Sequence, residues 1–178
     1  SSFGIYMPKF TGTIYEILSA PLSPIEIVFG YVGSAASKSI LLGLLILMTA
    51  KFFINIPVEK PLAMILLLIS TAFLFSMIGF IIGLVAKSFD ELQFVPLLII
   101  TPLTFLGGAF YSIEMLPSMW QSITLINPII YIISVFRWSF FSSSPIDIYL
   151  SLAVMMVIFI TALAVIVFIF KSGYKIKS

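Results

Sequence analysis

Four long stretches of apolar residues alternate with short polar connections along the chain. A helix needs about 20 predominantly apolar residues to cross the hydrocarbon core of a bilayer, which is about 30 Å thick. The stretches that meet this requirement are residues 27–54, 61–86, 92–111 and 148–170. The third contains Pro96 and Pro102, and we expect a kink there because proline removes a backbone donor and crowds the preceding turn. The pattern predicts an all-α integral membrane protein with four transmembrane helices in this chain.

The segment after the third stretch is apolar but repeatedly interrupted. The glycine pair Gly107-Gly108 ends the stretch, and Pro117 and Pro128 break the helical pattern beyond it. A water-exposed loop would not carry so much apolar surface, because burial of each methylene group away from water is favourable by about 0.8 kcal/mol. The segment is also too broken to cross a bilayer cleanly. We therefore predict a re-entrant helical hairpin over residues 113–141, with two short helices in or near the membrane interface.

The segment before the first stretch shows a different pattern. Phe10, Ile14, Ile17 and Leu18 follow the spacing i, i+4, i+7 and i+8, which places them on one face of a helix. Pro21 and Pro24 close this segment before the first span begins. The pattern predicts a short amphipathic helix over residues 11–20. Two interpretations remain open, an interfacial anchor helix and a docking helix for a soluble partner.

Composition supports the membrane assignment. The chain has 178 residues, of which 61% are hydrophobic and 9% charged, whereas soluble domains carry roughly 25% charged residues. The net charge of +2 gives no indication of a nucleic-acid partner. The chain has no Cys and no His, which excludes thiol chemistry, an imidazole base and a Cys/His zinc site. We predict no catalytic residues, no metal site and no cofactor, and no phosphate-binding loop occurs.

The lysines predict an orientation. One side of the membrane would hold the N-terminal segment, the connection at residues 87–91 and the C-terminal tail, with these lysines: Lys9, Lys87, Lys171, Lys175 and Lys177. The other side would hold Lys60 and Arg137, with Lys51 near it. Since Lys and Arg are enriched in cytoplasmic loops, the first side is expected to be cytoplasmic.

Three further features of the sequence can be interpreted in more than one way. Gly79 and Gly83 form a G-x-x-x-G pattern in the second span, which favours close helix packing within the chain or between protomers. Lys38 lies inside the first span, where a charge is a functional candidate unless the side chain reaches the headgroups. Arg137 is the only arginine. It is expected at an outer headgroup, with a salt bridge to Glu114 as an alternative.

Three stretches carry a resemblance to a known family: FTGTIYEILSAPLSPIEIVFGYVG, AKSFDELQFVPLLIITPLTFLGGAFYSIEMLP and INPIIYIISVFRW. Together they resemble the permease subunits of the ABC transporter type-2 family, which includes bacterial exporters of drugs and polysaccharides. The positions that match the family's motifs are Pro102, Gly107, Gly108, Phe110, Leu116, Pro117, Asn127, Pro128, Tyr131 and Arg137.

The resemblance implies a permease with six spans, in the inner (plasma) membrane of the cell, so that about two spans would precede Ser1. It also implies that two permeases form a homodimer around the pathway and that a separate ATP-binding subunit drives transport. Residues 11–20 would then be the coupling helix that contacts this subunit. The residues assigned to that contact are Phe10, Ile14, Glu16, Ile17, Leu18 and Pro21.

Two alternatives to an export permease stay open. One is a membrane-embedded enzyme that acts on a lipid-linked substrate, for which Glu114 and Arg137 are the available charged pair. The other is an inert remnant of a truncated permease gene. The sequence does not identify a substrate.

Overall fold

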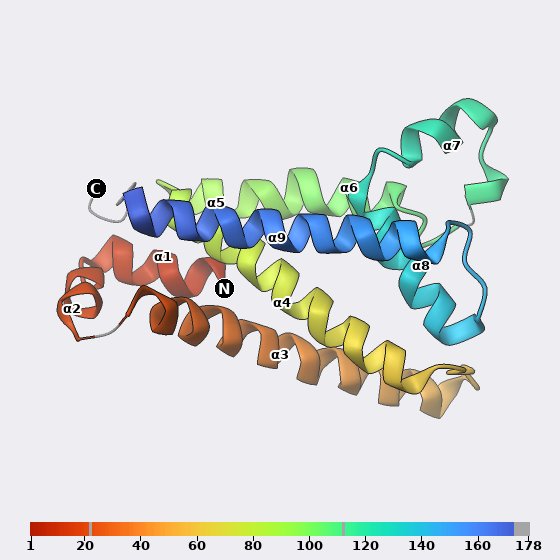
Figure 1. Cartoon of the computed structure of the whole chain (residues 1–178), viewed down its shortest axis with the longest axis horizontal. Helices are drawn as coiled ribbons and strands as arrows, with labels where there is room; N and C mark the ends of the chain where they lie inside the picture. The colour runs from red at the N-terminus through yellow and green to blue at the C-terminus, as the bar shows by residue number, and fades with distance from the viewer. Residues whose placement is uncertain (22, 112, 173–178) are drawn as a thin grey trace. The chain divides into compact units, whose positions relative to one another are not determined.

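The structure is a computed structural model that describes residues 1–21, 23–111 and 113–172, with the backbone alone for residues 17, 18 and 172. The described residues form helices joined by short connections and contain no strand (Figure 1). Its elements, in chain order, are α1 (Ser2–Thr11), α2 (Ile14–Ser19), α3 (Pro24–Phe53), α4 (Pro61–Val85), α5 (Phe89–Val95), the π-helical turn η1 (Pro96–Ile100), α6 (Thr101–Leu106), the 3-10 turn η2 (Ile113–Met115), α7 (Ser118–Thr124), α8 (Pro128–Phe141) and α9 (Ile148–Ser172). The predicted all-α class is confirmed.

Four helical stretches are long and apolar enough to cross a membrane: Pro24–Phe53, Pro61–Val85, Phe89–Leu106 and Ile148–Lys171. This agrees with the four predicted spans. The largest difference at a boundary is in the third stretch, which ends at Leu106 where the predicted span extends to residue 111. The helix ends there because Gly108 adopts a φ of 79°, in the left-handed region that favours glycine.

The helices expose large apolar side chains on their outer surfaces. Phe52 is 87% exposed, Leu62 72% and Met48 70%. The four stretches have mean hydropathies between 1.4 and 3.1. Because soluble monomers rarely expose large contiguous apolar patches, this exposure is consistent with helices that contact lipid.

The third span is irregular along its length. α5 passes into the π-helical turn η1 at Pro96, and α6 follows with Pro102 in its first turn. The Thr101 backbone N–H and hydroxyl both donate to the Pro96 carbonyl oxygen. Proline lacks the backbone N–H that continues a regular α-helix, and the turn is the local consequence.

The chain forms two compact units. Unit 1 comprises residues Ser1–Leu44, Ile69–Gln93 and Phe159–Ser178, and unit 2 comprises Leu45–Leu68 and Phe94–Ile158. The helices α3, α4 and α9 each contribute one part to each unit.

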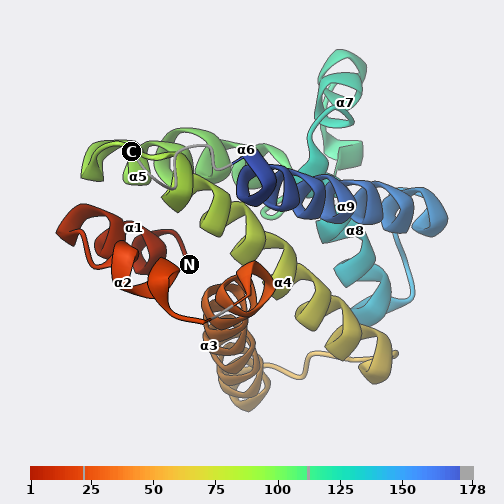
Figure 2. The same ribbon diagram turned by 60° about the vertical axis from the view of Figure 1, so that its left-hand side comes forward.

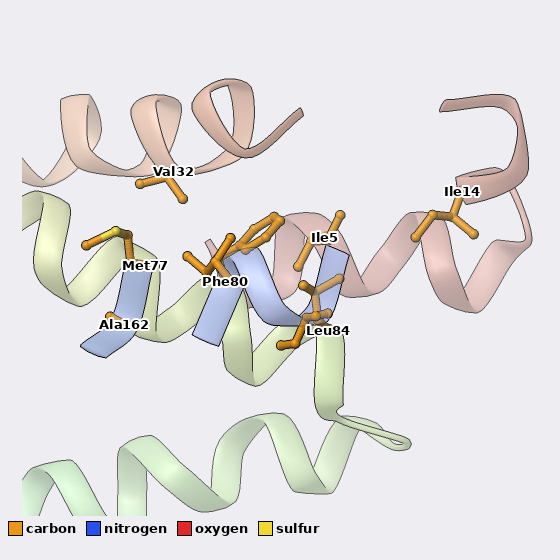
Figure 3. Packing of buried hydrophobic residues seen from close by; sticks show 9 residues of the cluster. Ile5, Ile14, Val32, Met77, Phe80, Leu84 and Ala162 are labelled. Carbon is orange, nitrogen blue, oxygen red and sulfur yellow. The ribbon is translucent and has the colours of Figure 1, made fainter. Parts of the chain in front are cut away.

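The core of unit 1 draws on five helices. Its buried residues are Ile5, Ile14, Val32, Met77, Phe80, Leu84, Ala162, Ile166 and Ile169. Figure 3 shows Ile5 of α1 and the α4 residues Phe80 and Leu84 gathered in this cluster. The core therefore connects α1 and α2, which precede the first candidate span, with the ends of α3, α4 and α9 that belong to this unit.

Unit 2 is organised around α8. Ile130, Ser134, Val135 and Ser139 of this helix are almost fully buried. α7 and α8 meet at an angle of 93° across a short break, and Figure 2 shows α7 directed away from α8. This bent pair has the composition of either a broken span or a re-entrant loop.

Candidate functional site

The first candidate site is α2, a six-residue helix between α1 and α3. α1 ends at Gly12, whose φ of 77° is in the left-handed region. α2 ends at Ala20, which adopts an extended conformation, and Pro21 comes next. α3 begins with a capping box in which the Ser23 N–H donates to the Glu26 carboxylate at 2.6 Å. Two turns therefore separate α2 from its neighbours.

The predicted apolar face of this segment is wrong in one respect. Phe10 belongs to α1 and Ile14 to α2, and the turn at Gly12 interrupts the helical spacing between them. Ile14 is 4% exposed and lies in the unit 1 core, whereas Phe10 is 63% exposed. The side chains of Ile17 and Leu18 lie outside the described residues. Since Ile14 is occupied by the protein's own core, it is not available to a partner.

The exposed side chains that the structure describes on α2 are polar or amphipathic. Tyr15 is 57% exposed, and Glu16 and Ser19 are also exposed. Pro21 is exposed just beyond the helix. Among the side chains of this segment that the structure describes, these residues are accessible and Ile14 is not.

α1 is held against the end of α4 by contacts that the sequence pattern did not reveal. The Lys9 ammonium donates to the Leu84 carbonyl oxygen at 3.0 Å, and the Tyr6 hydroxyl donates to the Lys87 carbonyl oxygen at 3.2 Å. The carbonyls at a helix C-terminus lack helical partners and carry partial negative charge. Lys9 therefore caps α4 and fixes the helix that leads into α2. The Tyr6 and Phe10 rings also pack against Phe89 of α5.

The two glycines of α4 both face α1. A Cβ atom at Gly83 would contact the Ser2 carbonyl oxygen and lie 2.5 Å from Ile5 Cγ2, whereas a Cβ at Gly79 would lie 3.5 Å from Ser1 Cβ. The G-x-x-x-G pattern thus lies at a close contact between two helices of the same chain.

The second candidate site is the turn between α6 and α8. The Arg137 guanidinium donates through Nη2 to the carbonyl oxygens of Gly108 at 2.7 Å and Tyr111 at 3.0 Å. Arg137 therefore holds the turn that comes after the glycine pair. Within the described residues it forms no ion pair with Glu114, which is exposed. The salt bridge considered from the sequence is not present.

Asn127 and Pro128 fix the start of α8. The Asn127 carboxamide oxygen accepts from the Ile129 N–H, which is an N-cap, while its Nδ2 donates to the Leu103 carbonyl oxygen of α6. Pro128 occupies the first helical position. The Tyr131 hydroxyl donates to the Leu125 carbonyl oxygen at 2.8 Å. The Asn-Pro-x-x-Tyr motif therefore shapes the bend between α7 and α8.

The remaining motif residues line the same turn region. Gly107 is buried, and a Cβ there would lie 3.1 Å from Ile129 Cγ2. Phe110 is 73% exposed and stacks on Phe105 of α6. Pro117 is the N-cap of α7, and the Leu116 carbonyl oxygen accepts from the Gln121 side chain.

The lysines singled out in the sequence, either for the orientation or, at Lys38, as a functional candidate, differ in environment. Lys38 on α3 is exposed, and Lys51 lies in the last turn of that helix. Lys60 Nζ lies 3.6 Å from the centroid of the Trp138 ring in unit 2. Lys175 and Lys177 lie outside the described residues.

Comparison with known proteins gives one family. The family described as ABC-2 type transporter matches residues 1–141. Inner membrane transport permease YadH of Escherichia coli K12 is 39% identical over 154 residues, which cover 86% of this chain and 60% of that protein. Inner membrane transport permease YhhJ of the same strain is 27% identical over 125 residues, 69% of this chain and 33% of that protein.

A relative outside this organism is Nodulation protein J of Sinorhizobium fredii. It is 28% identical over 112 residues, which cover 63% of this chain and 43% of that protein. The chain therefore spans only part of the length of these relatives. No solved structure matches the chain.

Proposed function

The chain belongs to the ABC-2 type transporter family, and on this premise we propose that it acts as part of an export permease in the inner membrane. Two copies would form the translocation pathway between them, and a separate ATP-binding subunit would supply the energy. The family match and the four candidate spans support this proposal. The names of YadH and YhhJ, both inner membrane transport permeases, agree with it.

The position of α2 is the observation that supports a role in energy coupling. This helix lies outside the candidate spans, directly before Pro24–Phe53, and it exposes Tyr15 and Glu16. Its other side is anchored, since Ile14 is part of the same core as Ile166 and Leu84. A partner that moves α2 would therefore act on the packed ends of α4 and α9 in unit 1. This arrangement suits a docking helix better than a lipid anchor.

The hairpin of α7 and α8 would be a re-entrant pair on the outer side of the membrane. Met119 and Ile126 are 71% and 83% exposed in this segment, so the hairpin presents apolar side chains where a bilayer would cover them. Arg137 and Asn127 hold its base to the end of α6 through backbone carbonyls. No observation specifically favours the alternative of a lipid-linked-substrate enzyme.

The test of the coupling role uses the full-length permease with its ATP-binding subunit. The variant Tyr15→Ala with Glu16→Lys changes only exposed side chains of α2. We expect normal membrane insertion and thermal stability, because the Ile14 core contact stays intact. Recovery of the complex should fall at least tenfold, since loss of an interface anchor costs about 2 kcal/mol or more.

Two controls interpret the result. Glu59→Lys makes the same charge change in the connection beyond the other end of α3 and should leave complex recovery unchanged. Ile14→Ala should lower the melting temperature as well as complex recovery, because it removes a buried side chain. Normal complex recovery and normal ATP hydrolysis in the Tyr15/Glu16 variant would refute the docking role. If the wild-type protein forms a stable, complete complex but shows no transport, the inert-remnant alternative would be favoured.

A further inference from the structure

A polar cavity lies in unit 2, between the turn after α6 and the end of α8. Its volume is about 550 Å³, within the range of small-molecule sites in proteins. Glu114, Arg137, Ser143 and Ser144 contribute polar groups to its lining, and Phe141 contributes an apolar wall. The cavity is therefore polar, and its lining carries one negatively charged and one positively charged side chain.

Arg137 is oriented within this lining by the protein itself. Its Nη2 donates to the Gly108 and Tyr111 carbonyl oxygens, and this pair of bonds fixes the guanidinium plane. Nε and Nη1 donate to no acceptor within the part of the chain that the structure describes. A guanidinium with free donors in a fixed plane matches a phosphate or a carboxylate.

The negatively charged group of the cavity, the Glu114 carboxylate, also has no partner among the described residues. The Glu114 carboxylate makes no hydrogen bond and no ion pair with any residue in the described ranges. The hydroxyl of Ser143 also has no protein partner among those residues, while the Ser144 hydroxyl donates to the Ile146 carbonyl oxygen. A ligand of a single charge would leave Glu114 or Arg137 unneutralised. A ligand that carries both charges would neutralise the two together.

The cavity lies where the helices of unit 2 end. The Glu59 and Lys60 N–H groups donate to the Phe140 and Ser139 carbonyl oxygens. The connection between α3 and α4 is therefore attached to the end of α8, next to the lining residue Phe141. Connections between spans lie at the headgroup region of a bilayer, where Trp138 beside Lys60 is a typical interfacial residue.

We propose that this cavity is a binding site for a zwitterionic headgroup that carries a phosphate and a primary amine. The phosphate accepts from Nε and Nη1 of Arg137, and the ammonium donates to the Glu114 carboxylate. Ser143 supplies a further donor to the phosphate. Such a headgroup occurs on membrane phospholipids and also on amphiphiles that a transporter exports. The site does not depend on the transport activity proposed for the chain.

The test measures lipid binding to the purified full-length protein in detergent by native mass spectrometry. The probes are phosphatidylethanolamine, which has both charges, and phosphatidylglycerol, which has the phosphate alone. We expect the wild-type protein to retain phosphatidylethanolamine at least fivefold better than phosphatidylglycerol. Glu114→Gln should abolish this preference, because it removes the negative charge from a side chain that stabilises no other part of the described structure. Ser143→Trp should weaken the binding of both lipids, because the larger side chain fills the cavity.

Glu59→Gln is the matched control, since it removes an exposed carboxylate at the same end of the helices without changing the cavity lining. It should leave the preference unchanged. Equal retention of the two lipids by the wild type, or an unchanged preference in Glu114→Gln, would overturn the proposal. ATP turnover by the whole complex distinguishes the sources: release of the bound molecule identifies an exported amphiphile, and continued retention identifies a bilayer lipid.

Discussion

The Asn127 side chain joins the start of α8 to the end of α6, because its Nδ2 lies 2.6 Å from the Leu103 carbonyl oxygen across 24 residues of sequence. The same carboxamide caps α8 through its oxygen. Asn127 is 6% exposed, so both bonds form away from water. One side chain thus sets the distance between the third candidate span and the hairpin.

Removal of the Asn127 carboxamide should destabilise the protein. Asn127→Ala loses an N-cap worth about 1 kcal/mol and leaves the partly buried Leu103 carbonyl oxygen without its donor, which costs about 1–3 kcal/mol when the acceptor is shielded from water. Asn127→Asp keeps an acceptor for the Ile129 N–H but loses the donor. We expect both variants to melt below the wild type in detergent, with alanine the lower. Equal melting temperatures for wild type and Asn127→Ala would contradict the structural role.

The two α4 glycines should differ in their tolerance of a methyl group. Gly83→Ala places Cβ against the Ser2 backbone and the Ile5 side chain, so α1 must shift, and overpacking typically costs about 1–3 kcal/mol. Gly79→Ala meets only ordinary van der Waals contacts. Thermal unfolding of the full-length protein should show a clear loss for Gly83→Ala and little change for Gly79→Ala. The reverse order would argue against the packing of α1 on α4.

The connection after α4 is expected on the cytoplasmic side, as the lysine distribution indicates. The chain has no cysteine, so single cysteines give an unambiguous label. Asp90→Cys should react with a membrane-impermeant maleimide only after cells are opened. Glu59→Cys, in the connection between α3 and α4, should react in intact cells. Labelling of the Asp90 position from outside would reverse the orientation.

The contact between Lys60 and Trp138 should stabilise unit 2 through a cation–π interaction. Such contacts contribute about 0.5–2 kcal/mol, depending on their exposure. A double-mutant cycle with Lys60→Met and Trp138→Leu isolates this energy, because methionine keeps most of the aliphatic length of lysine. We expect a coupling of at least about 0.5 kcal/mol in unfolding experiments on the full-length protein. Additive effects of the two substitutions would mean that the contact adds nothing to stability.

The sequence by itself determined the class of this protein and the number of its candidate spans. A lipid environment forces each crossing helix to be continuously apolar, so the four stretches are visible without any tertiary information. The breaks were equally visible, because glycine and proline act on the local backbone at Gly108, Pro96 and Pro128. Local rules of this kind need no knowledge of distant residues.

The tertiary structure decided which residues meet. Phe10 and Ile14 satisfy a helical spacing, yet the left-handed backbone at Gly12 places them on separate helices and buries Ile14 alone. Arg137 was expected at a headgroup or beside Glu114, but it donates to two backbone carbonyls 26 and 29 residues away. Every backbone carbonyl looks alike in a sequence. Only the packing of α6 against α8 makes those carbonyls available to Arg137 and Asn127, because a buried polar group must find whichever partner the fold brings within reach.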